Sequence, residues 1–244
     1  MTASSVLEPV PDDLPSIEVF RPQLAAADVS LPAYAAVPRD ASPQTPGVVL
    51  ILHIWGVDEP IRDTVRRFAS AGIAAVAPEL FHRSGAPDGD GQSDYTVFRP
   101  HAEKLKAPVV DADLRAAAQW LKARNPQGRI AVAGFCMGGF IALRQTIDNA
   151  GVFDACAVWY GRLTGLDPRK IAVPVVGSYG QSDAGIPAGE VREFFDRLAA
   201  PADLAIYPGA GHAFFDHTRP SYEPKAAQDS WRRTLDFLTK YLRA

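Results

Sequence analysis

One short stretch of this chain restricts its possible folds more than any other. Residues 134–139 read GFCMGG and lie between an apolar run at 129–133 and a helix-like run at 140–144. A strand, a tight turn of small residues with a nucleophile at its centre, and then a helix form the arrangement called a nucleophile elbow. The glycines suit this turn because it is sharp and neighbouring backbone must pass close by. Cys136 is then expected at a helix N-terminus, where free N–H groups and the helix dipole favour a thiolate.

The rest of the chain alternates strand-like and helix-like segments. Short strands are predicted at 17–20, 34–37 and 202–207, and continuous apolar runs, typical of strands buried on both faces, occupy 47–53, 73–78, 129–135, 155–160 and 173–179. Helical patterns cover 58–71, 109–124, 187–198 and 226–242. This alternation predicts an α/β fold in which helices cover both faces of a mainly parallel central sheet.

No linker, repeat or low-complexity block divides the chain. We therefore expect one domain over residues 16–244, preceded by a flexible lead-in over residues 1–15. The polar stretch 82–108 is expected to be a long loop, and loops of this length are often functional lids.

The composition argues against several classes of function. The formal net charge is −3, so there is no electrostatic case for binding nucleic acid or an anionic membrane. No apolar run is long enough to span a bilayer, and residues 1–15 lack a signal-peptide core. The two cysteines, Cys136 and Cys156, give neither a disulfide framework nor a metal-binding spacing. We expect a cytoplasmic protein with free thiols, no metal and no cofactor, acting as a monomer or small homo-oligomer.

Two downstream residues are candidate partners for Cys136. Asp183 and His212 each follow a predicted strand, at the end where the catalytic residues of open α/β sheets gather. Taken singly, the cysteine is as typical of a buried core residue, the aspartate of a turn and the histidine of a solvated loop. Together they follow the order nucleophile, acid, histidine, which is the order of α/β-hydrolase triads. The agreement of three placements favours a Cys-Asp-His triad.

These residues give the chain a family likeness. From about Ile17 to its end it resembles the dienelactone hydrolase family, which has the α/β-hydrolase fold. The resemblance is carried by GFCMGG at 134–139, APELFHR at 77–83, GQSD at 180–183 and GAGHAFF at 209–215. It implies a triad of Cys136, Asp183 and His212, and an oxyanion hole formed by the backbone N–H groups of Met137 and Ile54.

Two positions depart from the family pattern. His53 stands where the family usually has a glutamate that controls the charge of the thiol. A cationic histidine beside Cys136 would favour the thiolate outright, although a strand-end histidine satisfied by backbone is an equal alternative.

The second departure is Asp216, which replaces an arginine that binds the substrate carboxylate in the family's dienelactone-specific enzymes. Arg219, Arg83 and Arg99 are candidate replacements, since a guanidinium suits a carboxylate. For any one of these arginines, a solvated surface position is the more frequent alternative.

The expected function is hydrolysis of a small ester or lactone through Cys136. Trp55, Tyr95, Phe98 and Phe214 are candidate pocket residues, although aromatic side chains near strand ends are also ordinary packing.

Other functions stay open. They are an esterase or thioesterase acting on another small acyl substrate, and a non-catalytic binding protein with this fold. A glutamine amidotransferase is disfavoured because Phe214 stands where its acid would follow the histidine, and no GxGxxG motif supports a dinucleotide-binding domain.

Overall fold

A mixed sheet forms the centre of the molecule in this computed structural model, which describes residues 7–243. Within these residues the strands follow the spatial order β1-β3-β5-β4-β6-β7-β8-β9, and β2 pairs with β3 alone. Their bounds are β1 Ile17–Phe20, β2 Gln23–Ala25, β3 Ser30–Pro38, β4 Gly47–Ile51, β5 Ala74–Pro78, β6 Ile130–Phe135, β7 Ala155–Trp159, β8 Val175–Gly180 and β9 Ala202–Tyr207. From β5 to β9 neighbouring strands are parallel, whereas β3 is antiparallel to both β1 and β5.

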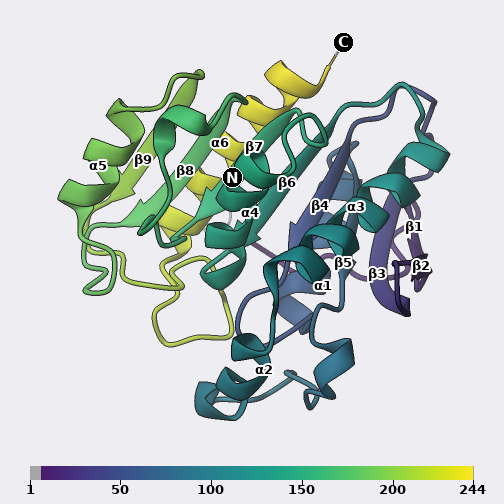
Figure 1. Cartoon of the computed structure of the whole chain (residues 1–244), viewed down its shortest axis with the longest axis horizontal. Coiled ribbons are helices and arrows are strands. Elements are labelled where there is room, and N and C mark those ends of the chain that lie inside the picture. The colour runs from purple at the N-terminus through teal and green to yellow at the C-terminus, as the bar shows by residue number, and fades with distance from the viewer. Residues whose placement is uncertain (1–6, 244) are drawn as a thin grey trace, which may run out of the picture.

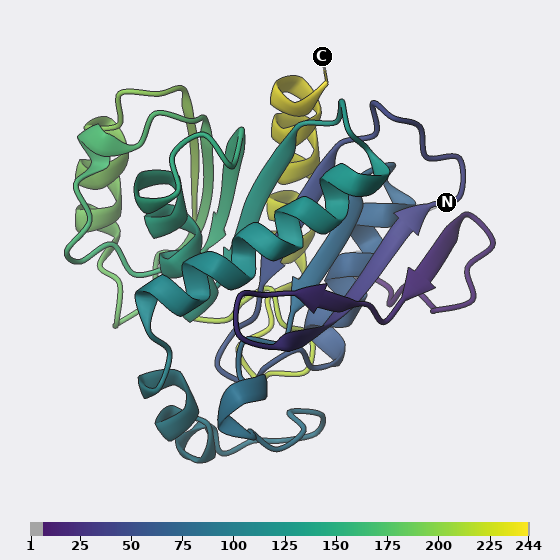
Figure 2. The same ribbon diagram turned by 45° about the vertical axis from the view of Figure 1, so that its right-hand side comes forward.

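Helices cover both faces of this sheet, as the views of Figures 1 and 2 show. Their bounds are α1 Glu59–Ser70, α2 Arg99–Glu103, α3 Ala107–Arg124, α4 Met137–Asp148, α5 Ala188–Asp196 and α6 Pro224–Leu242. In Figure 1, α3 and α4 lie in front of the sheet and α6 lies behind it. On the rear face α1 and α6 meet, since the rings of Phe68 and Trp231 lie 4.7 Å apart.

The sequence explains why the central strands lie inside. Every residue of β4, β5, β6, β7 and β8 is buried, as the continuous apolar runs predict for strands covered on both faces. The predicted α/β class with a mainly parallel sheet is therefore confirmed. Within residues 7–243, no helix combines the length and apolar character that crossing a membrane requires.

Two segments differ from the sequence expectation. The predicted loop at 82–108 contains short 3₁₀ turns at His82–Ser84 and Tyr95–Val97, the helix α2 and the start of α3. The sequence predicted a loop here because most residues of the segment are polar. The segment is anchored by one apolar residue at the start of α2, Phe98, which is fully buried.

The other segment is the expected lead-in. Residues 1–6 lie outside the described residues, but residues 7–15 are held against α1. The N–H of Val10 donates to Asp63 at 2.7 Å, and Arg67 donates to the carbonyl of Glu8 at 2.5 Å. These bonds satisfy the buried charges of Asp63 and Arg67, which also pair with each other.

Candidate active site

Cys136 occupies the turn between β6 and α4 in a strained backbone conformation, with φ 54° and ψ −116°. Such strain is typical of functional sites that the surrounding structure holds in place. The packing explains the neighbouring glycines: a Cβ on Gly138 would lie 2.5 Å from the carbonyl oxygens of Ile51 and Leu52. The N–H of Cys136 donates to the carbonyl of Trp159 at 3.0 Å, which ties the turn to β7. The local sequence thus forms the elbow that its pattern predicts.

The elbow brings the thiol to the other two expected residues. His212 Nε2 lies 3.0 Å from Cys136 Sγ, and His212 Nδ1 lies 2.6 Å from Asp183 Oδ2. The second carboxylate oxygen of Asp183 accepts the N–H of Gly185 at 2.9 Å, so the acid is fixed on both sides. Asp183 follows β8 and His212 follows β9. Thiol, imidazole and carboxylate therefore form one unbroken chain of contacts.

The environment of His212 favours its charged form. Burial opposes protonation, but the hydrogen bonds to Asp183 and Cys136 outweigh it and raise the pKa of His212 to about 10. The imidazole is still 41% exposed, so a substrate approaching from solvent meets this histidine directly.

The backbone N–H groups of Ile54 and Met137, the two expected oxyanion donors, are free in the described residues. Within residues 7–243, neither Ile54 nor Met137 donates a backbone hydrogen bond. Met137 is the first residue of α4, where an N–H has no acceptor within the helix, and Ile54 follows β4. Free N–H groups at a helix N-terminus suit an anionic oxygen.

His53 is buried and turns toward two carboxylates. Its Nε2 atom lies 2.7 Å from Asp58 Oδ1, and its Nδ1 atom lies 3.9 Å from Asp216 Oδ2. In the described part of the chain it makes no hydrogen bond with the Cys136 thiol. From the sequence, His53 was expected either to influence the charge of the thiol or to hydrogen-bond to the backbone. Its interaction with two carboxylates is a third outcome, which the local sequence did not predict.

The three candidate arginines are already paired. Arg83 binds both oxygens of the buried Asp113, at 2.6 and 2.9 Å, and both oxygens of Asp28. Arg99 is exposed and lies 3.7 Å from Glu103. Arg219 Nε lies 3.2 Å from Asp216 Oδ2.

The candidate aromatic residues divide by burial. Trp55, Phe98 and Phe214 are buried, whereas the side chain of Tyr95 is 52% exposed. Trp55 packs edge-on against Phe98, with ring centroids 5.5 Å apart. Phe214 packs in the same way against Tyr160, at 5.4 Å. The contacts of Trp55, Phe98 and Phe214 are therefore mostly ring packing, which was the alternative to a role in a pocket.

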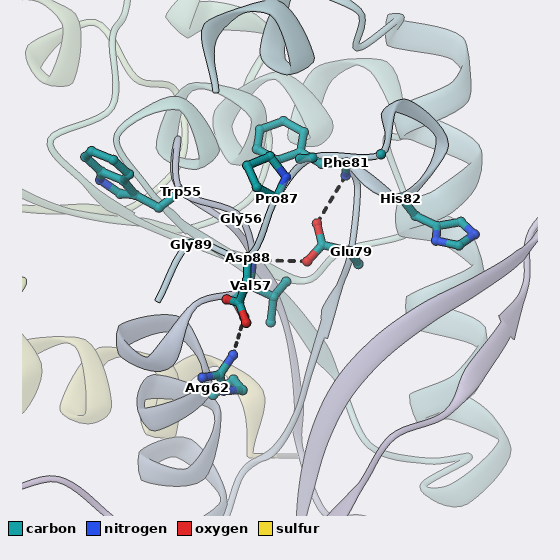
Figure 3. Close-up of a pocket in the computed structure, with 12 residues that line it drawn as sticks. Trp55, Gly56, Val57, Arg62, Glu79, Phe81, His82, Pro87, Asp88 and Gly89 are labelled. Atoms are coloured by element: carbon teal, nitrogen blue, oxygen red, sulfur yellow. Dashed lines mark hydrogen bonds between the residues drawn. The ribbon is translucent and has the colours of Figure 1, made fainter. Parts of the chain in front are cut away.

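A cavity of about 340 Å³ lies beside the turn that contains Trp55 (Figure 3). Its lining comes from Trp55, Gly56, Val57, Arg62, Glu79, Phe81, His82 and residues 85–89, and it includes neither Cys136 nor His212. Figure 3 shows the Glu79 carboxylate accepting the N–H groups of Val57 and Phe81, both at 3.2 Å. Burial raises the pKa of Glu79 despite these two bonds. Glu79 thereby links the end of β5 to the chain after β4.

Sequence reasoning missed Tyr160, which lies beside His212. Its ring centroid is 5.1 Å from that of His212, and its backbone φ of 38° is unusual for a residue other than glycine. Burial raises the pKa of Tyr160 well above its usual value, and the nearby negative charges of Asp216 and Cys136 add to this rise. Its position directly after β7 was the available signal, because that is the strand edge where Asp183 and His212 also lie.

Comparison with known proteins places the chain in a family. The family model described as "Dienelactone hydrolase family" matches residues 31–242. The chain belongs to the dienelactone hydrolase family. It is therefore a hydrolase that acts on esters or lactones, as the resemblance of its motifs predicted.

Relatives in this family align over almost the whole chain. A protein of Escherichia coli (strain K12) named "Putative carboxymethylenebutenolidase" is 34% identical, over 98% of this chain and 92% of its own length. A relative of the same name from Yersinia pestis is 36% identical, over 86% and 84% of the two chains.

Solved structures of dienelactone hydrolases have a fold similar to that of this chain. The crystal structure of a "Putative Dienelactone Hydrolase" from Klebsiella pneumoniae has a TM-score of 0.83 and 33% identity, covering 92% of this chain and 99% of its own. A dienelactone hydrolase-like promiscuous phosphotriesterase from metagenomic libraries has a TM-score of 0.75 at 20% identity, over 93% and 99% of the two chains. That second likeness concerns the fold alone. The α/β-hydrolase fold of the chain is thus established.

Proposed function

We propose that this hydrolase cleaves a small ester or lactone by nucleophilic catalysis, with Cys136 as nucleophile, His212 as acid and base, and Asp183 as the residue that orients the imidazole. The observation that carries the proposal is the continuous contact from Cys136 Sγ through both nitrogens of His212 to Asp183. A nucleophile within hydrogen-bond reach of a base, which is itself oriented by a third group, is the arrangement that covalent catalysis needs.

In the resting state the imidazole of His212 carries a positive charge. With a pKa near 10, His212 is protonated at neutral pH, and its Nε2 atom faces the sulfur at 3.0 Å. A neighbouring imidazolium stabilises a thiolate, which is the nucleophilic form of cysteine. The position of Cys136 at the N-terminus of α4 acts in the same direction.

In the first half-reaction, the thiolate forms a bond with the carbonyl carbon of the ester. The carbonyl oxygen becomes an oxyanion, which the N–H groups of Ile54 and Met137 stabilise, each by about 3 kcal/mol as measured for such donors. When the C–O bond breaks, the leaving alkoxide takes a proton from His212. The acyl group then remains as a thioester on Cys136.

In the second half-reaction, His212 accepts a proton from water, and the resulting hydroxide attacks the thioester carbonyl. The C–S bond breaks, the carboxylic acid leaves and the thiolate is restored. Asp183 stabilises the imidazolium during both steps, since it lies 2.6 Å from Nδ1.

The decisive experiment measures hydrolysis of a panel of lactones, aryl esters and thioesters by the wild type, Cys136→Ala and Cys136→Ser. We expect Cys136→Ala to lose activity and Cys136→Ser to retain a small fraction of it. Cys156→Ala is the matched control, because it removes the fully buried thiol of β7 and leaves the site intact. Product release by Cys136→Ala at the wild-type rate would disprove the proposal.

A second measurement follows the covalent intermediate. Acid-quenched reactions are digested, and mass spectrometry locates the acyl group. It should lie on the peptide that contains Cys136 and be absent from the peptide that contains Cys156. A quenched enzyme without any acyl adduct, at a substrate concentration that saturates turnover, would favour direct attack by water.

A further inference from the structure

Arg219 is the centre of a buried network next to the proposed triad. Its Nη1 group donates to the carbonyl of Gln92 at 2.6 Å, and its Nε group donates to Asp216 at 3.2 Å. Its Nη2 atom lies 3.8 Å from Asp58 Oδ2, and its guanidinium lies 3.9 Å from the centre of the Trp55 ring. Only 15% of the side chain is exposed. Every edge of this guanidinium therefore already faces a partner.

The carboxylates of this network depend on Arg219. Asp58 and Asp216 are 2% and 4% exposed, and they share His53, whose two ring nitrogens face one carboxylate each. Buried carboxylates are stable only when cations or hydrogen-bond donors compensate them. Arg219 is the guanidinium that reaches both of them.

The network contacts the turn that carries the proposed oxyanion donor. Trp55, which the guanidinium covers, follows Ile54 directly in the chain. The turn is narrow, since His53 and Gly56 form a bridge and the N–H of Gly56 donates to the carbonyl of His53 at 3.3 Å. The Trp55 ring also packs edge-on against Phe98. Trp55 therefore contacts both Arg219 and Phe98, and because it is covalently joined to Ile54, these contacts restrain the turn in which the N–H of Ile54 lies.

Arg219 also joins two segments that are distant in the sequence. Gln92 belongs to residues 79–98, the connecting segment between β5 and α2, whereas Arg219 follows His212 in the loop after β9. The connecting segment is also attached at Asp90, which accepts the N–H of Glu59 at 2.7 Å, and at Arg83, which pairs with Asp28 and Asp113. Loss of Arg219 would therefore loosen this segment without releasing it.

We propose that Arg219 is a positioning residue that fixes the oxyanion turn and clamps the connecting segment over it, and that it does not bind a substrate carboxylate. This inference rests on the proposed function, because it assigns Ile54 to the oxyanion hole. Its consequence is specific: the contribution of Arg219 to turnover is the same for a neutral substrate and for one that carries a carboxylate. An arginine that bound the substrate would act on the charged one alone.

The test compares Arg219→Met and Arg219→Lys with the wild type on two matched lactones, one with a carboxylate and one with its methyl ester. For Arg219→Met we expect kcat to fall roughly 10- to 100-fold on both lactones, the effect of a misplaced catalytic group, with KM changed less than threefold. Lysine keeps the charge near Asp216 but has no fork for Gln92 and Trp55, so Arg219→Lys should recover only part of the loss. Arg169→Met, which removes an exposed arginine of the 3₁₀ turn Pro168–Lys170, is the matched control.

Alkylation separates positioning from general damage to the fold. Iodoacetamide attacks the thiolate without needing an oxyanion hole, so Cys136 should be alkylated at nearly the wild-type rate in Arg219→Met. If that variant melts below the assay temperature, Arg219→Lys provides the same comparison.

A loss confined to the carboxylate-bearing lactone and expressed in KM would overturn the inference, and so would unchanged kcat on both lactones. Failure of the proposed function gives a different result, since Cys136→Ala would then remain active whatever Arg219 does.

Discussion

His212 Nε2 lies 3.0 Å from Cys136 Sγ, although 76 residues separate the two in the chain. Each residue is at the carboxyl end of a parallel strand or directly after it, so the sheet brings them to one edge. Asp183 completes the contact from the end of β8, which lies next to β9 and is separated from β6 by β7.

Asp183→Asn should lower kcat/KM for ester hydrolysis by roughly 10²- to 10⁴-fold, because the amide neither stabilises the imidazolium nor fixes the same tautomer. Steady-state kinetics on an aryl ester measures this effect. Asp167→Asn, at the start of the 3₁₀ turn Pro168–Lys170, where the carboxylate pairs with Arg169, is the control that should retain wild-type kinetics. A loss of less than threefold for Asp183→Asn would contradict the role of this carboxylate.

The stabilisation that comes from His212 should decrease as the pH rises. Its pKa is raised from 6.5 to about 10 in the folded state, so its contribution is complete below about pH 6.5 and is lost as the pH passes about 10. Urea unfolding of the wild type and of His212→Gln between pH 6 and pH 10.5 measures the difference. We expect that difference to shrink steadily above pH 7, whereas a constant difference would show that the folded-state pKa is not raised.

Gly138→Ala should damage both stability and activity. The new Cβ would lie 2.5 Å from two backbone carbonyl oxygens, so β4 or the elbow must shift. We expect the free energy of unfolding to fall by about 1–3 kcal/mol and hydrolysis to fall with it, because the thiol moves relative to His212. Gly189→Ala, in α5 with no atom within 4 Å of the new Cβ, should be neutral or stabilising by up to about 1 kcal/mol. Equal behaviour of the two variants would contradict this account.

Arg83→Met should reduce stability and leave the KM for small esters unchanged. The guanidinium binds both oxygens of Asp113, which is 1% exposed, so its removal leaves a buried charge and costs about 1.5–3 kcal/mol. Urea unfolding and steady-state kinetics together test this. In Arg83→Met/Asp113→Leu the uncompensated charge is gone, and we expect part of the stability to return. A raised KM at unchanged stability would instead assign Arg83 to the substrate.

Local patterns allowed the α/β class to be predicted because a parallel strand and an amphipathic helix each have their own periodicity of apolar residues. The nucleophile elbow was also predictable from a local pattern, because residues 134–139 are contiguous and their glycines meet a steric requirement of the turn itself. Cys136, Asp183 and His212 each follow a different predicted strand, and their order in the chain predicted that they act together. The structure brings these three side chains into contact.

The sequence by itself therefore determined the order of the elements, the turn at Cys136 and the strand ends from which its partners come. Only the tertiary structure decided which groups compensate each buried charge. Arg83 pairs with Asp28 and Asp113, 55 and 30 residues away, and His53 pairs with Asp58 and faces Asp216. Such pairing depends on which surfaces the fold brings together, and no local periodicity encodes it. For that reason the sequence could not distinguish Arg219 from the other two candidate arginines, Arg83 and Arg99. Arg219 becomes the centre of a network only when the chain is folded.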